Sequence, residues 1–376
     1  MSKHIVILGG SFAGISALKG IVEGLAKTNH KVTLITKDAF AFNNIAAPRA
    51  LVEEEIVEKI VTPYDTSAFF QKHKDTLSLV VANIESVHRN HVIVKKQNSD
   101  ASEQINFDIA VVALGTSYPF PYKPTTSNAQ EWKDHLAKVR SELKTAKNVV
   151  IIGGGPVGVE VAGEIATDLP DIKVTLVHSQ EKLMKYTSPK FSARLEEMMN
   201  KKNVKFLLNE RVKDVNGGQI ETKAGAQTVN LESGKSLDAD YVFACTGGTP
   251  NSAPLKNGEL SSYVNKGYLR VNEFLQVPDF PNIFALGDIA DLAEVKLAAN
   301  IRSHAPVLVA NVLQYVLQPD TPLKKTYSVS NFKFAVATFG RNGGAMMVGS
   351  MVFGDWVTKN VKSKGLFADF ISANLK

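Results

Sequence analysis

The sequence predicts an α/β fold with two Rossmann-like dinucleotide-binding domains and a small α+β C-terminal domain. Two segments, residues 4–14 and 148–158, each run from β-favouring residues into a glycine-rich turn, and an apolar pattern of helical period follows. A near-identical second β-favouring run comes after each, KVTLIT from Lys31 and KVTLVH from Lys173. Each unit therefore has the strand, turn, helix and strand order of a nucleotide-binding βαβ unit.

The glycines of the second unit have separate physical roles. Gly153 makes the turn, Gly155 lets the backbone approach a pyrophosphate, and Gly158 lets helix and strand pack closely. Pro156 and Val157 begin the helix, whose free N–H groups favour phosphate. The matching residues of the first unit are Gly9, Gly10, Ser11, Ala13 and Gly14. One such motif is weak evidence, but two predict two dinucleotides, as hydride transfer between nicotinamide and flavin requires.

Length and composition limit the number of domains and the class of protein. A chain of 376 residues with 44% hydrophobic and 21% charged residues is typical of a globular protein of two to three domains. No apolar run approaches the ~20 residues of a membrane-spanning helix. The first strand begins at His4, which leaves no room for a signal or transit peptide, and Ser2 excludes the usual myristoylation signal. We therefore expect a cytoplasmic protein.

Charge and cysteine content narrow the function classes. The net charge of +6 favours anions such as nucleotides, acidic membranes or nucleic acid. The basic residues are scattered, however, so nucleic acid is not expected as the main partner. The lone cysteine, Cys245, excludes an intramolecular disulfide, so electrons must leave a flavin directly for an acceptor. Cys245 itself is expected to be a buried packing residue. No metal site is predicted.

Residues 1–124 are expected to form the first part of an FAD-binding domain. Strands are predicted at 77–81 and 91–95, with the polar run 97–104 as a hairpin turn. A buried strand at 108–116 carries Ala113 and Gly115 at its end as candidate FAD contacts. Thr36, Lys37 and Asn44 lie on the loop expected beside the flavin. Arg49 has two open interpretations, a contact with pyrophosphate or flavin and a surface ion pair.

Residues 125–247 are expected to form an inserted NAD(P)H-binding domain. Helices are predicted at 131–144 and 188–202, a strand at 204–208, a turn-rich stretch at 216–235, and a closing strand that ends at Gly247. An acid after the second strand would bond the ribose 2′-OH of NADH. His178 and Ser179 stand there instead, followed by Gln180, Glu181 and Lys182. We therefore expect NADPH to be accepted about as well as NADH, unless His178 only packs on the adenine.

Residues 248–325 are expected to complete the FAD-binding domain. A strand ends at Gly287 and Asp288, and Asp288 is either a helix cap or a contact to the ribityl hydroxyls; the double repeat favours the contact. Lys296 either lies near the flavin or is solvated. A helix is predicted at 298–317, kinked or started by Pro306, with His304 in a packing role.

Residues 326–376 are expected to form the C-terminal domain. Strands are predicted at 333–339 and 346–353. The last stretch, 365–375, is apolar at helical spacing. Docking on the core and contact with a membrane surface both stay open for it.

Seven short motifs, in this order, resemble the FAD- and NAD(P)H-dependent pyridine-nucleotide oxidoreductases across nearly the whole chain. Within them the chain is most similar to the apoptosis-inducing-factor-like branch, as a fungal-type relative. The motifs are KDAF from Lys37, NIAAPR from Asn44, GVEVAGE from Gly158, HSQ from His178, GDIAD from Gly287, GRN from Gly340 and KSKGLF from Lys362.

The resemblance implies NAD(P)H oxidation with a quinone-type acceptor, with FAD as the bound cofactor. It places Glu160 near the nicotinamide–flavin contact and Lys362 near the flavin ring, where a cation favours the anionic reduced flavin. A type II NADH dehydrogenase-like or ferredoxin-reductase-like role, or a nucleic-acid-binding role, remains an alternative. Two positions depart from the pattern: Ser11 replaces a glycine, and Thr36 replaces the acid for the adenosine ribose. The oligomeric state is left open.

Overall fold

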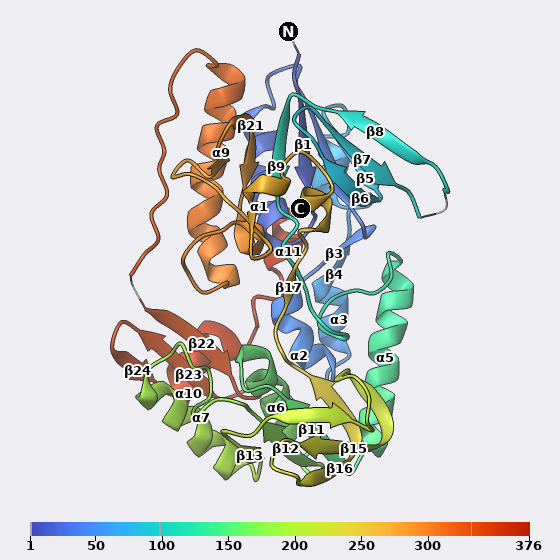
Figure 1. The fold of residues 1–376 in the computed structure, drawn as a ribbon, viewed down its shortest axis with the longest axis vertical. Coiled ribbons are helices and arrows are strands. Elements are labelled where there is room, and N and C mark those ends of the chain that lie inside the picture. The colour runs from blue at the N-terminus through green and yellow to red at the C-terminus, as the bar shows by residue number, and fades with distance from the viewer. Residues whose placement is uncertain (1, 98, 332) are drawn as a thin grey trace.

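The structure is a computed structural model that describes residues 2–97, 99–331 and 333–376. Two six-stranded sheets with parallel cores form the two large bodies of the molecule, one above the other in Figure 1. The chain crosses from the upper body to the lower body and returns, so the second unit is inserted in the first. The expected α/β class is confirmed.

The first sheet has the strand order β20-β21-β9-β1-β2-β5. Its parallel strands are β1 (His4–Leu8), β2 (Lys31–Thr36), β5 (Leu77–Val81), β9 (Ile109–Val112) and β21 (Phe280–Ala285), with β20 (Gln276–Val277) antiparallel at the edge. Side chains alternate between faces along a strand, so Ile5 and Ile7 pack with helices α1 (Phe12–Gly24) and α9 (Ile301–Leu317), while Val6 and Leu8 pack on the other side. Burial on both faces explains the uninterrupted apolar run of β1.

The second sheet has the order β13-β12-β11-β16-β15-β14. Its parallel strands are β11 (Asn148–Ile152), β12 (Lys173–Val177), β13 (Lys205–Leu207) and β16 (Ser236–Ala244), flanked by helices α5 (Ala129–Thr145), α6 (Pro156–Asp168) and α7 (Pro189–Lys201). The antiparallel strands β14 (Val212–Val215) and β15 (Lys223–Leu231) complete it. The expectation of a turn-rich stretch at 216–235 is wrong over β15, which pairs with β14 and β16 and buries Gln227, Val229 and Leu231 at every second position.

Shorter elements connect the two bodies and cover the first sheet. They are β3 (Phe40–Phe42), β4 (Val61–Pro63), β6 (Asn83–Val87), β7 (His91–Lys95), β8 (Ser102–Asn106), β10 (Thr116–Ser117), β17 (Thr249–Pro250), β18 (Val264–Asn265), β19 (Tyr268–Leu269), α2 (Ala47–Ala50), α3 (Glu55–Ile60), α4 (Ala68–Lys72), α8 (Ala253–Lys256), and the 3₁₀ turns η1 (Asn44–Ala46), η2 (Ser261–Tyr263), η3 (Gly287–Ile289) and η4 (Ala298–Asn300). Strands β10 and β17 pair antiparallel where the chain leaves and re-enters the first body.

The C-terminal piece comprises β22 (Phe334–Thr338), β23 (Gly344–Val348), β24 (Met351–Phe353), α10 (Asp355–Thr358), the π-helical turn η5 (Lys359–Ser363) and α11 (Phe370–Asn374). The single strand expected at 346–353 is a hairpin, which turns at Gly349 with φ +62°. Helix α11 returns to the first body and lies beside α1 (Figure 1).

The last apolar stretch docks on the core. Ile371 and Leu375 are 1% and 2% exposed in the cluster that holds α1, and Phe370 stacks on Phe12 with ring centroids 5.0 Å apart. Docking, one of the two expected placements of this stretch, is therefore confirmed. Within the part of the chain that the structure describes, none of the helices has the length and apolar character needed to span a membrane.

Candidate functional site

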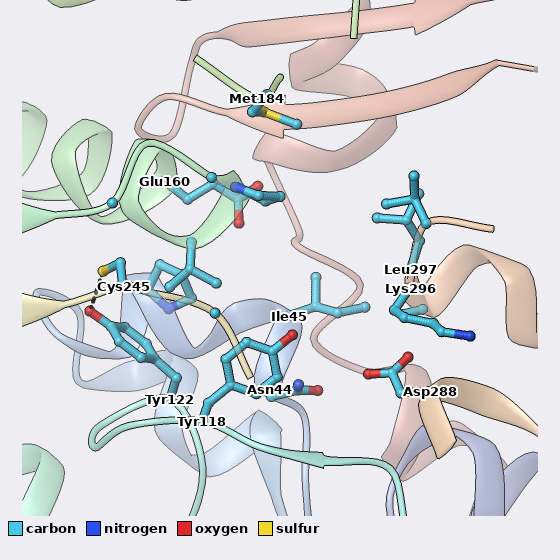
Figure 2. Close-up of a pocket in the computed structure, with 18 of the residues that line it drawn as sticks. Asn44, Ile45, Tyr118, Tyr122, Glu160, Met184, Cys245, Asp288, Lys296 and Leu297 are labelled. Carbon is cyan, nitrogen blue, oxygen red and sulfur yellow. Dashed lines mark hydrogen bonds between the residues drawn. The ribbon is translucent and has the colours of Figure 1, made fainter. Parts of the chain in front are cut away.

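A cavity of about 840 Å³ opens between the two large bodies, and the C-terminal piece forms part of its wall (Figure 2). Most of the residues singled out from the sequence line it: Ser11, Ala13, Asn44, Ala113, Gly115, Gly153, Gly155, Pro156, Val157, Glu160, His178, Ser179, Gly247, Asp288, Lys296 and Lys362. The fold thus brings both glycine-rich turns to one space.

The two turns share one geometry. Gly9 and Gly153 have φ of +110° and +119°, values that L side chains rarely adopt. A Cβ on Gly14 would lie 1.8 Å from the carbonyl oxygen of Gly9, and a Cβ on Gly158 would lie 1.9 Å from that of Gly153. These contacts hold each helix N-terminus against its strand, which leaves the first N–H groups of α1 and α6 directed at the cavity end of the sheet.

The predicted residues Gly9, Gly10, Gly14, Gly158 and Gly287 shape the backbone behind the cavity wall rather than line it. Two others lie off the wall for a different reason. Thr36 is 6% exposed and close to Gly10, and the hydroxyl of the buried Tyr64 donates to the Gly10 carbonyl. Lys37 donates through Nζ to the carbonyl of Pro124 at 3.1 Å. Neither side chain borders the cavity, so their assignment as FAD contacts remains a prediction.

One interpretation of Arg49, a surface ion pair, is wrong, and its contact with pyrophosphate or flavin stays a prediction. Its guanidinium is 2% exposed and donates to both carboxylate oxygens of Glu164, at 2.9 and 2.8 Å, and through Nη1 to the carbonyl of Ser363 at 2.8 Å. The ion pair is buried, not at the surface. Burial raises the pKa of Glu164, and the bond from Arg49 opposes that rise.

Asp288 lies at the end of β21, where the sequence places it, and its Oδ2 accepts a hydrogen bond from the Thr116 hydroxyl at 3.0 Å. Lys123, which sequence reasoning missed, also lines the cavity and donates to the Thr116 carbonyl. Burial lowers the pKa of Lys123, and the charge of Asp288 counters this effect. A lysine between two proline-marked turns gives no local signal of such a position. Lys123 and Asp288 thus place a cation and a hydrogen-bond acceptor on either side of Thr116.

Glu160 and Lys362 meet in the cavity wall, although 202 residues separate them. Lys362 Nζ lies 2.5 Å from Glu160 Oε1, and the same oxygen accepts from the backbone N–H of Thr338 at 3.1 Å. Both residues are under 9% exposed. The π-helical turn that carries Lys362 is a form often found at functional sites. Lys362 is therefore a fixed cation at the cavity, in contrast to the solvated charge that its sequence context alone would suggest.

The loop after β12 shows how His178 is held. Its Nδ1 accepts from the backbone N–H of Gly154 at 3.0 Å, so Nε2 carries the proton, and that buried atom has no partner among the described residues. Burial lowers the pKa of His178, which keeps the ring neutral. Lys182 donates to the carbonyl of Thr187 instead of reaching the cavity. The exposed cations that line this space are Lys185, Arg211 and Arg302.

Two buried polar residues, Cys245 and His304, make hydrogen bonds in or next to the cavity wall. Cys245 lines the cavity, and its Sγ lies 3.1 Å from the Tyr122 hydroxyl; burial raises the pKa of the thiol to about 12, which keeps it protonated (Figure 2). His304 accepts at Nδ1 from the Gly287 N–H at 3.3 Å, and its Nε2 donates to Glu294 at 2.8 Å. Burial lowers the pKa of His304. His304 therefore packs beside the Asp288 turn, as expected.

The residues present fit two dinucleotides. In the second turn a Cβ on Gly155 would meet nothing within 4 Å, so the backbone there is open to a ligand. Lys123 is a partly buried cation with a backbone partner, and the unpartnered Nε2 of His178 is a donor beside the same turn. Asn44 and Tyr118 also line the cavity (Figure 2). Donors and cations converge where pyrophosphates and ribose hydroxyls would lie.

Comparison with known proteins agrees with this geometry. Residues 3–309 match the family described as pyridine nucleotide-disulphide oxidoreductase. The human ferroptosis suppressor protein 1 is 31% identical over 371 residues, covering 97% of this chain and 93% of that protein. The FAD-dependent oxidoreductase FVFD30 of Flammulina velutipes is 33% identical over 326 residues, covering 83% and 94%. The sulfide:quinone oxidoreductase of Aquifex aeolicus shares the fold, with a TM-score of 0.75 at 16% identity over 99% of this chain and 92% of that one.

These findings confirm the expected resemblance, the enzyme class and the cofactor pair of FAD with NADH or NADPH. The chain belongs to the pyridine nucleotide-disulphide oxidoreductase family.

Proposed function

We propose that this protein is a cytoplasmic FAD-dependent oxidoreductase that oxidises NAD(P)H and passes the electrons to a quinone-type small molecule. The observation that carries the proposal is the single cavity shared by the two glycine turns and the Glu160–Lys362 pair. Residues 1–124 and 248–325 would hold FAD, residues 125–247 would hold NAD(P)H, and residues 326–376 would cover the flavin. The name of the FAD-dependent oxidoreductase FVFD30 supports this class of enzyme. The quinone-type acceptor is what the resemblance to the apoptosis-inducing-factor-like branch implies.

FAD, when bound, supplies the chemistry: it takes a hydride from the nicotinamide and returns electrons to an acceptor. The chain supplies position and charge. The α1 N-terminus, Lys123 and Asp288 would bind the FAD pyrophosphate and ribityl chain, and the α6 N-terminus and His178 would bind NAD(P)H. Facing turns would place the two rings in contact, and such positioning accounts for much of the rate in two-substrate reactions.

Lys362 would hold its positive charge beside the flavin ring, and Glu160 would fix the direction of its Nζ. A cation fixed in a site of low water content stabilises negative charge that develops in the reaction. Cys245 takes no part in electron transfer, because the described chain offers it no second thiol and its thiol is protonated.

The experiment is a steady-state comparison of acceptors. The FAD-loaded protein is given NADH or NADPH with short-chain quinones in one series and with a one-electron protein acceptor, such as a ferredoxin, in another. We expect turnover with the quinones to exceed turnover with the protein acceptor. Turnover confined to the protein acceptor would favour a ferredoxin-reductase-like role and contradict the proposal.

A further inference from the structure

Most of the exposed large apolar side chains lie near one rim of the cavity; Leu317, at the C-terminal end of α9, does not. Among the described residues the large apolar side chains that are most exposed are Val295 at 41%, Leu317 at 47%, Met351 at 59%, Trp356 at 79% and Val361 at 39%. Val295 and Val361 also line the cavity, so they stand at its mouth. Trp356 lies in the same continuous helical segment as Val361, and Met351 belongs to the neighbouring strand β24.

Two segments of the chain form this rim, and they contact each other. One lip is the segment around Val295, where the side chain of Asn300 donates to the Val295 carbonyl at 2.9 Å and Arg302 follows in α9. The other lip is the segment from Trp356 to Phe367. Arg302 lies over the Phe367 ring at 5.6 Å, which connects the lips. We call Val295, Arg302, Trp356, Lys359, Val361 and Lys364 the apolar–basic rim.

The charges of this rim have one sign. Lys364 and Arg302 are exposed and Lys359 is partly exposed. Two acids beside the rim are occupied. Arg194 and the Gly344 N–H donate to Asp355 at 2.6 and 3.1 Å, and Tyr327 and His304 donate to Glu294. Asp369, two residues beyond Phe367, is exposed. A tryptophan this exposed is uncommon on a soluble protein surface, and tryptophan is enriched where one side of a ring meets lipid and the other meets water. Lysine and arginine beside it favour anionic headgroups.

We propose that the apolar–basic rim rests on an anionic lipid surface, with Trp356 inserted at the headgroup level. The cavity mouth then faces the membrane, so an apolar acceptor can enter from the lipid past Val295 and Val361. The acceptor part of this inference rests on the proposed function; the lipid contact does not. The contact replaces the C-terminal helix as the membrane-facing element, because Ile371 of α11 is buried and Phe370 is stacked on Phe12.

Vesicle flotation of the full-length, FAD-loaded protein tests the contact. The vesicles are phosphatidylcholine with or without phosphatidylserine. We expect binding that needs phosphatidylserine and weakens as salt rises. Trp356→Ser should lower the affinity about tenfold, in keeping with loss of a buried apolar side chain. Lys359→Glu with Lys364→Glu should abolish binding, since each removed cation alone is worth about fivefold.

Leu317→Ser is the matched control, because Leu317 is also an exposed apolar residue but lies at the far end of α9. It should bind vesicles as the wild type does. Wild-type protein that binds no vesicles, or Trp356→Ser protein that binds like the wild type, would overturn the proposal. Loss of a dimer in Trp356→Ser, measured by light scattering in protein that ignores vesicles, would assign the rim to a second copy and also overturn it.

A second readout separates this inference from the proposed function. Trp356→Ser should keep the wild-type rate with a water-soluble short-chain quinone and lose most of the rate with a long-chain quinone embedded in vesicles. Equal rates for the two proteins on the embedded quinone would contradict the rim's role. Absence of activity with either quinone in the wild type would contradict the proposed function while leaving vesicle binding as an independent result.

Discussion

The helices that follow the two glycine turns begin alike and then differ. Aligning Gly14 with Gly158 sets Ser16, Gly20 and Gly24 of α1 opposite Glu160, Glu164 and Asp168 of α6. In α1 the small residues let α9 approach closely: a Cβ on Gly20 would lie 2.9 Å from Val309, and one on Gly24 would lie 2.5 Å from Leu313. In α6 the same face carries three acids at i, i+4 and i+8.

Each acid of α6 meets a cation from another part of the chain. Glu160 pairs with Lys362, Glu164 pairs with Arg49, and Asp168 pairs with Arg341 at 2.8 Å, while Arg341 also reaches Glu53 at 2.5 Å. The first repeat thus fixes its helix inside its own apolar core. The second repeat uses its helix to connect the nucleotide turn to the other body and to the C-terminal piece. Both repeats therefore carry the same glycine-rich turn, but only the helix of the second repeat connects its turn to other domains.

The largest expected effect comes from blocking either turn. Gly14→Val should yield protein without flavin, because its side chain would collide with the Gly9 carbonyl. Gly158→Val should keep FAD but slow flavin reduction by NADH about a thousandfold, ~4 kcal/mol. Flavin absorbance and stopped-flow reduction measure the two outcomes. Gly155→Ala is the control for folding, since a Cβ there meets nothing within 4 Å. A colourless Gly158→Val protein would contradict the assignment of FAD to the first turn and NAD(P)H to the second.

The next largest effect comes from removing the buried cation of the cavity wall, Lys362. Lys362→Met should lower kcat about a hundredfold, in the range of a lost transition-state donor, with FAD still bound. Lys359→Met changes a lysine of the same turn that is partly exposed, and it should leave kcat with soluble quinone unchanged. Steady-state kinetics and flavin content of both variants check this. Equal losses in the two variants would mean that the turn, and not the cation, matters.

The Arg49–Glu164 and Arg341–Asp168 ion pairs of α6 differ in burial, so comparing them shows how much burial adds to the stability effect of an ion pair. Arg49→Gln leaves Glu164 without its partner in a buried site and should lower the free energy of unfolding by about 3–5 kcal/mol. Arg341→Gln acts where the arginine side chain is 43% exposed and should cost about 1 kcal/mol or less. Urea unfolding measures both values. If Arg49→Gln fails to fold, Glu164→Gln retains a hydrogen-bond acceptor and should cost less. Equal, small costs for Arg49→Gln and Arg341→Gln would remove the argument that α6 couples the domains.

The smallest effect concerns nucleotide choice at the second turn. His178 is neutral and carries its proton on Nε2, so it neither repels nor strongly binds a 2′-phosphate. We therefore expect kcat/KM for NADPH and NADH to agree within about tenfold. His178→Glu should move the preference toward NADH by about tenfold, ~1.4 kcal/mol, because a carboxylate repels the phosphate. His178→Gln is the neutral control. A wild-type preference for NADH of about a hundredfold would show that the loop discriminates by another group.

Some features of the two repeats follow from local sequence patterns, and others depend on contacts between distant residues. The turns, the strands beside them and Asp288 follow local patterns, and these could be predicted because glycine positions and strand periods are set within a few residues. Lys362 was found through resemblance alone. The partners of Arg49 and Arg341 are 115 and 173 residues away, and no period encodes such contacts. For the same reason the burial of Arg49, the place of Lys123 in the cavity and the exposure of Trp356 could not be predicted.

The central claim is that the two turns bring NAD(P)H and FAD together in one cavity. Anaerobic stopped-flow mixing of the purified protein with NADH or NADPH tests it most directly. The account predicts a yellow protein whose flavin absorbance is bleached by either nucleotide and restored when a short-chain quinone is added. Protein that cannot be loaded with FAD, or bound flavin that neither nucleotide bleaches, would contradict it.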